Sequence, residues 1–272
     1  MVSTAELEWH GLMAAEQSRP LMARSHMHPE VELNLVLDGT AAYATPWGLV
    51  ELPRRRLTAF WGGFPHRLLA RDVDLLVVTV PLSAMVGRAA LDGALGMVVQ
   101  GYWLLGTDEE AGHDEFLLRR WIADLARGAA DPAARACEAE LHARLARLGV
   151  GVEAKDAARL WGASAADRLL AGVARSYTQA ASVAELAADA GVHPTYAAKV
   201  FKDAFGMPLW EYVTHLRVAH AVSLLTGSEW CVDRIAFESG FTSRSSFYRA
   251  FGRLTGRSPA LLRRSAGPAA VG

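Results

Sequence analysis

Cysteine is nearly absent from this sequence, with two residues among 272. Cys137 and Cys231 fall in helical patterns in different predicted domains, which argues against a structural disulfide and is typical of a reducing cytosol. There is also no apolar run long enough to span a bilayer, and no basic segment followed by an apolar core at the start. We therefore expect a soluble, cytoplasmic protein without a membrane partner.

An excess of charge is missing as well, because the formal net charge is −1. The distribution of charge is uneven. Residues 172–272 carry 11 Lys and Arg against 7 Asp and Glu, whereas residues 1–171 carry 17 against 22. The length suits two globular domains. A basic second domain joined to an acidic first domain is typical of a protein that meets a polyanion through the second domain alone.

Residues 182–259 contain two copies of one pattern. Each copy has an apolar pair, then a glycine, then a Phe that precedes a second glycine. The residues are Leu186, Ala187, Gly191, Phe201 and Gly206 in the first copy, and Ile235, Ala236, Gly240, Phe251 and Gly256 in the second. The two copies are offset by 49 to 50 residues. An internal repeat at a fixed period indicates a structural unit used twice.

Each copy predicts a helix-turn-helix unit. Ser182 and Glu185 form a capping box at the start of a helix, Gly191 suits the turn, and Pro194 suits the first position of the next helix. The periodicity predicts an inner face made of Tyr196, Ala197, Val200 and Phe201 in the first unit, and of Phe247, Phe251 and Leu254 in the second. The outward positions are Thr195, Ala198, Lys199 and Lys202, then Arg244, Ser245, Tyr248 and Arg249.

One apolar helix is predicted between the two units, from Pro208 to Thr226. At 1.5 Å per residue it is about 28 Å long, close to the roughly 34 Å of one DNA turn. Residues 239–264 contain six arginines and no acidic residue. A basic segment is also compatible with a solvated tail, but here the arginines lie on a periodic, capped and repeated framework. We therefore expect the outward positions to contact double-stranded DNA.

The second half of the chain, from about residue 170 to 264, resembles the DNA-binding domain of the AraC/XylS family of bacterial transcription regulators. The matching residues are Leu216 to Ala221, Leu224, Leu225, Ile235, Ala236, Gly240, Phe241, Phe247, Phe251, Gly256, Ser258, Pro259 and Arg263. Two positions depart from the family pattern. His193 replaces a small capping residue, which predicts a less well capped recognition helix, and Gly252 replaces a lysine.

The first part of the chain predicts short strands. Val31 to Leu37 alternates and ends at Asp38-Gly39, a hairpin signal. Further strands are expected at residues 40–45, 49–52, 57–61, 66–70 and 75–80, with a turn at Pro46-Trp47-Gly48. Closely spaced antiparallel strands suggest a small barrel or jelly roll. The predicted fold class is α+β, with a cupin-like barrel and a helix pair at residues 1–160 and an all-helical domain with two helix-turn-helix units at 161–272.

Four polar residues of this barrel form a candidate site. His26, His28 and Glu32 share parity on a strand, and His66 opens a later one. The run resembles the first motif of the cupin barrels, in which such residues bind a metal, and imidazoles with a carboxylate suit transition metals. The alternative is a polar pocket whose members satisfy one another. No cofactor is required by the sequence, and a transition metal held by these four residues is the one candidate.

The same four residues, together with Arg24, Trp47 and Trp61, are the candidate effector site, because aromatic faces with a few polar groups suit a small molecule. The stretch from Ser25 to His66 is similar to the AraC-family subgroup represented by the melibiose regulator, which implies a sugar effector. Two helices are predicted at 112–128 and 131–148, after a shorter one at 82–91; in this family such a pair implies a homodimer. Their apolar positions are Phe116, Leu117, Trp121, Leu125, Cys137, Leu141, Leu145 and Leu148.

The sequence thus predicts a transcription regulator, not an enzyme, with double-stranded DNA, a sugar-like effector and a second copy as partners and RNA polymerase as a further candidate. Residues 149–165 are the expected linker. Two alternatives stay open. One is a metal-dependent cupin enzyme fused to a DNA-binding module, and the other is a constitutive DNA binder whose barrel serves only as a scaffold.

Overall fold

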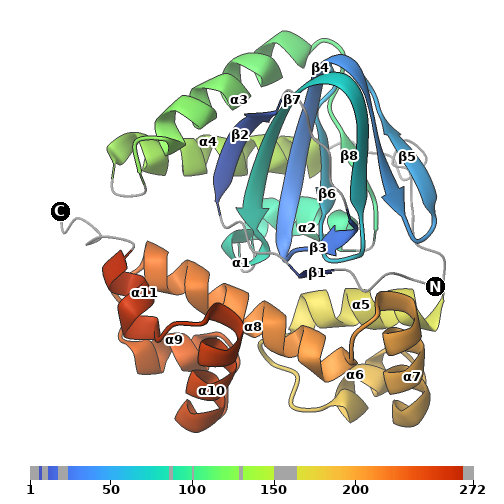
Figure 1. Cartoon of the computed structure of the whole chain (residues 1–272), viewed down its shortest axis with the longest axis vertical. Coiled ribbons are helices and arrows are strands. Elements are labelled where there is room, and N and C mark those ends of the chain that lie inside the picture. Colours follow the sequence, from blue (N-terminus) through green and yellow to red (C-terminus); the bar gives the residue numbers. More distant parts are fainter. Residues whose placement is uncertain are drawn as a thin grey trace. The chain divides into compact units, whose positions relative to one another are not determined.

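The chain divides into two compact units, residues 1–162 and 163–272. The computed structural model describes residues 6–7, 12–17, 24–85, 88–99, 101–128, 131–149 and 164–265 (Figure 1). Most of the predicted linker, residues 150–163, lies outside these described residues. The first unit is rich in sheet and the second is helical, so the predicted α+β class is confirmed.

The first unit contains one six-stranded antiparallel sheet. Its strands are β2 (Met13–Gln17), β4 (Glu30–Thr45), β5 (Gly48–Leu52), β6 (Thr58–Trp61), β7 (Arg67–Pro81) and β8 (Leu104–Leu105). They pair in the order β2-β7-β4-β6-β8, with β5 on β4. A separate parallel pair joins β1 (Glu6–Leu7) to β3 (His26–Met27). Within the described residues the pairing does not close into a ring, so the sheet-rich domain is shown while the closed barrel is not.

The hairpin predicted at Asp38-Gly39 is wrong. β4 continues through this point and pairs with β7 on both sides, with register shifts between Val36 and Thr40 (Figure 1). Gly39 has φ +81°, and a Cβ there would lie 2.2 Å from the backbone oxygen of Asp72, which itself has φ +43°. The turn residues therefore form opposed bulges that bend one long ribbon, and the two strands expected at 66–70 and 75–80 are likewise one strand.

The helices of the first unit are α1 (Leu82–Met85), the 3₁₀ turn η1 (Ala89–Leu91), α2 (Asp92–Val98), α3 (Ala111–Leu125) and α4 (Pro132–Gly149). The predicted helix at 82–91 is thus divided into α1 and η1. Helices α3 and α4 confirm the predicted pair, and α3 packs on β2 and β7. Phe116, one of the predicted apolar positions of this pair, is 60% exposed, whereas its neighbour Leu117 is buried.

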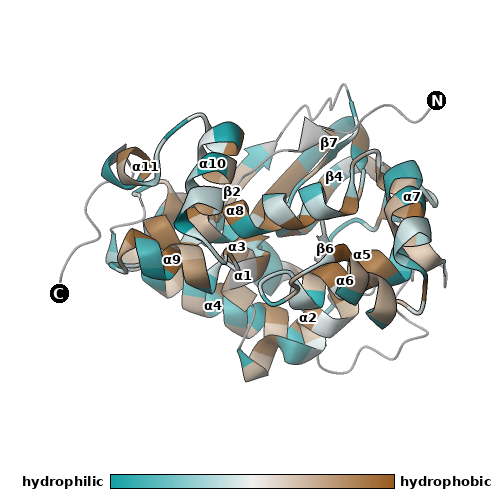
Figure 2. Cartoon of the chain, turned by 90° about the horizontal axis from the view of Figure 1, so that it is seen from below, coloured by the Kyte–Doolittle hydropathy of each residue, from teal (hydrophilic) through white to brown (hydrophobic). Residues whose placement is uncertain are grey.

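The second unit consists of α5 (Ala165–Ser176), α6 (Val183–Asp189), α7 (Pro194–Phe205), α8 (Leu209–Gly227), α9 (Val232–Glu238), α10 (Arg244–Thr255) and α11 (Pro259–Ser265). Helix α8 is the predicted connector. It contacts α7 of the first helix-turn-helix unit, α9 and α10 of the second, and α11, which follows them (Figure 1). Hydrophilic residues lie on both α7 and α10, which are the second helices of the two helix-turn-helix units (Figure 2).

Candidate nucleic-acid interface and a buried histidine cluster

The first recognition helix, α7, is capped by a residue that was expected to cap poorly. Nδ1 of His193 accepts a hydrogen bond from the Thr195 backbone N–H at 3.3 Å, and Pro194 occupies the first helical position. The imidazole therefore performs the role that a serine hydroxyl has in α10, where Ser243 accepts from the Ser246 N–H at 3.2 Å. A cap bond is therefore present at His193, because a ring nitrogen is also an acceptor, and the weaker cap stays a prediction.

Both recognition helices bury one face and expose the other. Ala197 and Phe201 of α7 are buried, as are Phe247 and Phe251 of α10. All eight predicted DNA-contacting residues are exposed: Thr195, Ala198, Lys199 and Lys202 on α7, and Arg244, Ser245, Tyr248 and Arg249 on α10. Each set of four thus shares one helix face that is open to a ligand.

Tyr196 was assigned to the inner face of α7 and is 53% exposed instead. It is the third residue of the helix, one position before the buried Ala197. The exposed face therefore includes an aromatic residue that the periodicity had placed inside.

Some of the basic residues are engaged within the protein. Arg244 pairs with Asp233 of α9 at 2.8 Å, and Arg253 pairs with Glu211 of α8 at 3.4 Å. In contrast, within residues 164–265 no hydrogen bond or ion pair is made by the side chains of Lys199, Lys202 or Arg249. These three cations are free to meet phosphates.

Two arginines of the family pattern serve the fold and not the surface. Arg217 is buried and donates to the carbonyl oxygens of Tyr177 at 2.6 Å and Ala180 at 2.5 Å, just after α5. Arg263 donates to the carbonyl of Trp230 at 2.6 Å, beyond the end of α8. Both guanidinium groups satisfy carbonyl oxygens of the segments that follow α5 and α8. Arg263 therefore does not belong with the arginines that face solvent.

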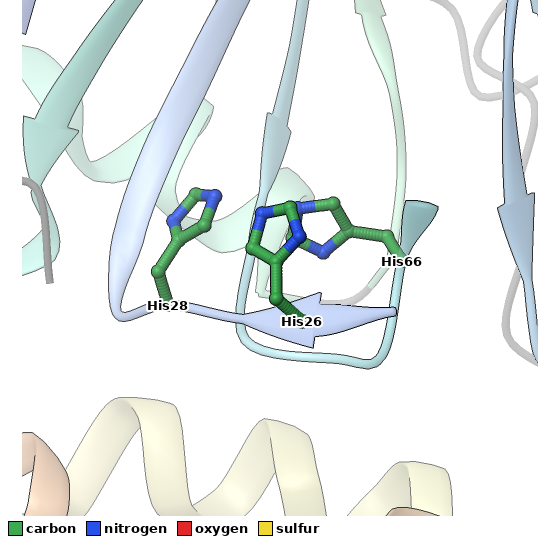
Figure 3. Close-up of side chains that lie close together, drawn as sticks. All are labelled: His26, His28 and His66. Atoms are coloured by element: carbon green, nitrogen blue, oxygen red, sulfur yellow. The ribbon is translucent and has the colours of Figure 1, made fainter. Parts of the chain in front are cut away.

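A second candidate site lies inside the first unit. His26 of β3, His28 of the segment before β4, and His66 just before β7 are buried, and each offers a ring nitrogen within 4.8 Å of the others (Figure 3). Reciprocal backbone hydrogen bonds of 3.0 and 2.9 Å join His26 to His66. A Cβ on Gly62 would lie 2.2 Å from the ring of His28, so the glycine leaves room for this imidazole.

Glu32 completes the predicted set. Its Oε2 lies 3.0 Å from Nε2 of His28 and 3.9 Å from Nε2 of His66, and the hydroxyl of Tyr43 donates to its Oε1. Glu30 adds a second carboxylate, 3.4 Å from Nδ1 of His28. The four residues expected to converge are therefore together, although β3 ends at Met27 and the regular strand resumes only at Glu30.

The electrostatics of this cluster favour a charged pair beside a neutral ring. Burial opposes charge on His28, but the hydrogen bonds to Glu30 and Glu32 outweigh it and raise the pKa of His28 to about 9. Burial also opposes charge on Glu32, yet the hydrogen bond to His28 lowers the pKa of Glu32 to about 2. Burial and the nearby histidines hold the pKa of His66 well below its ordinary value. His66 is therefore neutral, with an available lone pair.

The donor set also fits a transition metal. Three imidazoles and one carboxylate match the ligands of zinc and related ions. Nε2 of His66 is buried and has no hydrogen-bond partner among the described residues, as expected for a nitrogen that meets a ligand. The ring nitrogens would have to draw together, because metal–nitrogen bonds are about 2.0–2.1 Å. A metal held here by His26, His28, Glu32 and His66 would act as a Lewis acid or as a fixed cross-link.

The other predicted effector residues differ in position. Trp61 is fully buried, and its indole N–H donates to the Pro29 carbonyl at 3.2 Å, so its polar group serves the fold. Trp47 is half-buried in the turn between β4 and β5, and its ring lies 5.2 Å from that of Phe64. Arg24 is exposed.

Three residues near the cluster are absent from the predicted site. Tyr43 hydrogen-bonds to Glu32 and to Asn34, and the ring of Trp103 lies 5.6 Å from that of Tyr43. Asn34 Nδ2 and Trp103 Nε1 are buried without a hydrogen-bond partner among the described residues. The shared parity of Glu32 and Asn34 could have revealed the asparagine, but nothing in the sequence places Trp103 beside it.

The repeated, capped two-helix units make residues 163–272 a DNA-binding domain of the helix-turn-helix class. A family model described as a helix-turn-helix domain matches residues 186–265. The activator AarP of Providencia stuartii is 31% identical over 97 residues, covering 36% of this chain and 72% of that protein. The chain belongs to the AraC family of transcription regulators.

The similarity extends beyond the DNA-binding half. The melibiose operon regulatory protein of Escherichia coli K12 is 24% identical over 254 residues, covering 88% of this chain and 83% of that protein. Both relatives are named for control of transcription, which confirms the prediction of a regulator and not an enzyme. A crystal structure of ToxT from Vibrio cholerae aligns over 94% of this chain at 16% identity with a TM-score of 0.44, and a similarity this loose adds nothing to the assignment. None of the described helices is both long and apolar enough to cross a membrane.

Proposed function

We propose that this regulator binds two adjacent half-sites on double-stranded DNA through α7 and α10 and that a small molecule held in its first unit controls the binding. The observation that carries the DNA part is the pair of capped helices that each expose one polar face. Arg244 and Arg249 are suited to bidentate contact with guanine, whereas Lys199 and Lys202 act as phosphate contacts.

The first unit is proposed to be a cupin-like effector domain. Buried polar atoms of Asn34, His66 and Trp103 have no hydrogen-bond partner among the described residues. Hydroxyl groups of a sugar both donate and accept, so they suit such a mixed set. The similarity to a melibiose operon regulator supports a sugar over other small molecules. Arg24, Trp47 and Trp61 remain proposed contributors, with Trp61 acting through its ring alone because its N–H is engaged.

Assembly is part of the same proposal. Helices α3 and α4 are proposed to pair two copies of the chain, and the exposed Phe116 of α3 supports an interface there. RNA polymerase is proposed as the partner that receives the regulatory signal at the promoter.

One experiment tests the DNA contacts. Affinity of the full chain and of its Arg244→Ala variant is measured on the preferred duplex, obtained by selection from random sequence, and on a scrambled duplex. A larger loss on the preferred duplex is expected, because Arg244 reads a base. Equal losses on both duplexes would make Arg244 a backbone contact only.

A second experiment tests the effector. Thermal stability of the full chain is measured with a panel of mono- and disaccharides, with and without a chelator. A ligand at a hundredfold excess over its Kd stabilises the folded state by about 2.7 kcal/mol. A response to one sugar that survives chelation supports the sugar proposal, and no response to any sugar removes it.

A metal in the histidine cluster is a second candidate function for the first unit. It is favoured by the convergence of three buried imidazoles and Glu32. Elemental analysis of the purified protein should then find about one transition metal ion per chain, and the His26→Ala variant should lose it. A metal-free protein whose stability is unchanged by added zinc would exclude this function.

A further inference from the structure

An ion pair crosses the turn of the second helix-turn-helix unit. Asp233 lies in the first turn of α9 and Arg244 is the first residue of α10, and the arginine Nε lies 2.8 Å from the Asp233 Oδ1. The Arg244 side chain is 71% exposed, and the Asp233 side chain is 52% exposed. An ion pair this exposed adds little to folding stability, so its main consequence is the position of the guanidinium.

We propose that Asp233 is a positioning residue that holds Arg244 ready to read a base, an inference that rests on the proposed contact of α10 with DNA. A guanidinium has five N–H donors in a rigid fork. The short contact to the carboxylate is made at Nε and not at a terminal nitrogen, and it is an ion pair without a hydrogen bond. The two terminal NH₂ groups can therefore make bidentate contact with O6 and N7 of guanine. Because the side chain is held before DNA arrives, less conformational entropy is lost on binding.

The repeat within the chain supports this assignment. The first helix-turn-helix unit has Ala184 at the position equivalent to Asp233, and Pro194 at the position equivalent to Arg244. The acidic residue and the arginine therefore occur together in the second helix-turn-helix unit, and neither occurs in the first. The pair belongs to the particular sequence that α10 reads and is not a requirement of the helix-turn-helix fold.

Asp233 should also act against unspecific binding. A carboxylate next to the recognition helix repels phosphates wherever the protein sits on DNA. Removing it is therefore expected to weaken binding to the preferred sequence and to leave unchanged or strengthen binding to other sequences. A residue that only supported the fold would weaken both.

The test uses the full chain and the duplex that it selects from a random library, with a scrambled duplex as the second probe at the same salt concentration. Asp233→Ala is expected to lower affinity for the selected duplex about fivefold and not to lower affinity for the scrambled one. Arg244→Ala should also lose discrimination between the two duplexes, and adding Asp233→Ala to it should cause no further loss of discrimination. Glu238→Ala is the matched control, because Glu238 is another exposed α9 carboxylate that pairs with Arg234 and not with Arg244.

Four outcomes are decisive. Equal losses on both duplexes, or losses of Asp233→Ala and Arg244→Ala that add in full, would overturn the inference. If Asp233→Ala unfolds, the isosteric Asp233→Asn variant replaces it, and unchanged discrimination in that folded variant would overturn the inference too. A wild-type chain that enriches no sequence would overturn the proposed function, and the inference with it.

Discussion

Single glycines decide how closely parts of the first unit approach one another. Gly62 shares backbone hydrogen bonds of 2.9 Å with His28 and Glu30, and its missing side chain is the space in which the His28 ring lies. Gly39 likewise leaves room at the bulge of β4, where an added Cβ would collide with the backbone of Asp72. The sequence marks both as glycines without showing what approaches them.

Gly62→Ala should displace the His28 ring and destabilise the first unit by roughly 1–3 kcal/mol, because a Cβ there would lie 2.2 Å from the imidazole and the site is fully packed. Chemical denaturation measures the change. Gly112→Ala in α3 is the control, since nothing lies within 4 Å of its added Cβ. Equal stability of Gly62→Ala and Gly112→Ala would show that His28 does not occupy this position in solution.

At the scale of elements, sequence patterns predicted the helical unit well and the sheet less well. The cap at Ser182 and the apolar spacing of α7 and α10 are local features, and the structure follows them. The Asp38-Gly39 hairpin failed because a bulge and a turn use the same residues, and only pairing with the distant β7 distinguishes them.

The arginines show the same limit at the candidate DNA site. Arg217 and Arg263 donate to carbonyl oxygens of the segments that follow α5 and α8, while Arg249 faces solvent, and their local sequences do not separate these roles. In the same way, parity predicted that Glu32 lies with the histidines, but Trp103 lies beside Tyr43 through tertiary packing alone. The roles that depend on the partner across the fold are the ones that the sequence did not predict.

Arg217→Lys is expected to destabilise the second unit by about 2 kcal/mol. One ammonium cannot replace the planar fork that now donates to two carbonyls, and at least one of those acceptors would be left buried and unpaired. The free energy of unfolding of the variant measures the loss. The exposed Arg249→Lys should change stability by less than about 0.5 kcal/mol. A loss in Arg217→Lys no larger than this control would contradict the structural role.

The contact between Tyr177, which follows α5, and His220 of α8 should make the second unit sensitive to acid. The Tyr177 hydroxyl donates to Nδ1 of His220 at 3.2 Å, and burial lowers the pKa of His220 to about 4 from its ordinary 6.5. Between these values the unfolded chain binds a proton that the folded chain does not. Stability is therefore full above pH 6.5 and falls as the pH drops toward 4, by at most about 3 kcal/mol.

The variant His220→Gln isolates this contribution. The difference in unfolding free energy between wild type and variant should be constant above pH 7 and should shift in favour of the variant as the pH falls from 6.5 to 4. Subtracting the two curves removes the other titrating groups that both proteins share. A difference that is independent of pH would show that His220 is not buried as a neutral ring.

At the scale of the whole molecule, the two units carry charge of opposite sign, and only the second is proposed to meet DNA. Residues 172–272 are positive by four charges while the remainder is negative by five. The near-zero total therefore conceals a basic surface on α7 and α10, where Lys199, Lys202 and Arg249 have no carboxylate partner among the described residues of this unit. Binding to DNA should depend on salt through these side chains, despite the neutrality of the chain.

If Lys199, Lys202 and Arg249 each neutralise one phosphate, the logarithm of affinity should fall with the logarithm of salt with a slope of about −2.7. Raising sodium chloride from about 50 to about 200 mM would then weaken binding roughly fortyfold. Affinity of the full chain for a scrambled duplex at several salt concentrations gives the slope. Lys202→Ala should make the slope shallower by about one. Arg135→Ala, which removes an exposed arginine from α4 of the acidic unit, should leave it unchanged. A change in slope with Arg135→Ala would mean that the first unit also contacts DNA, and the proposal that only the second unit binds DNA would be wrong.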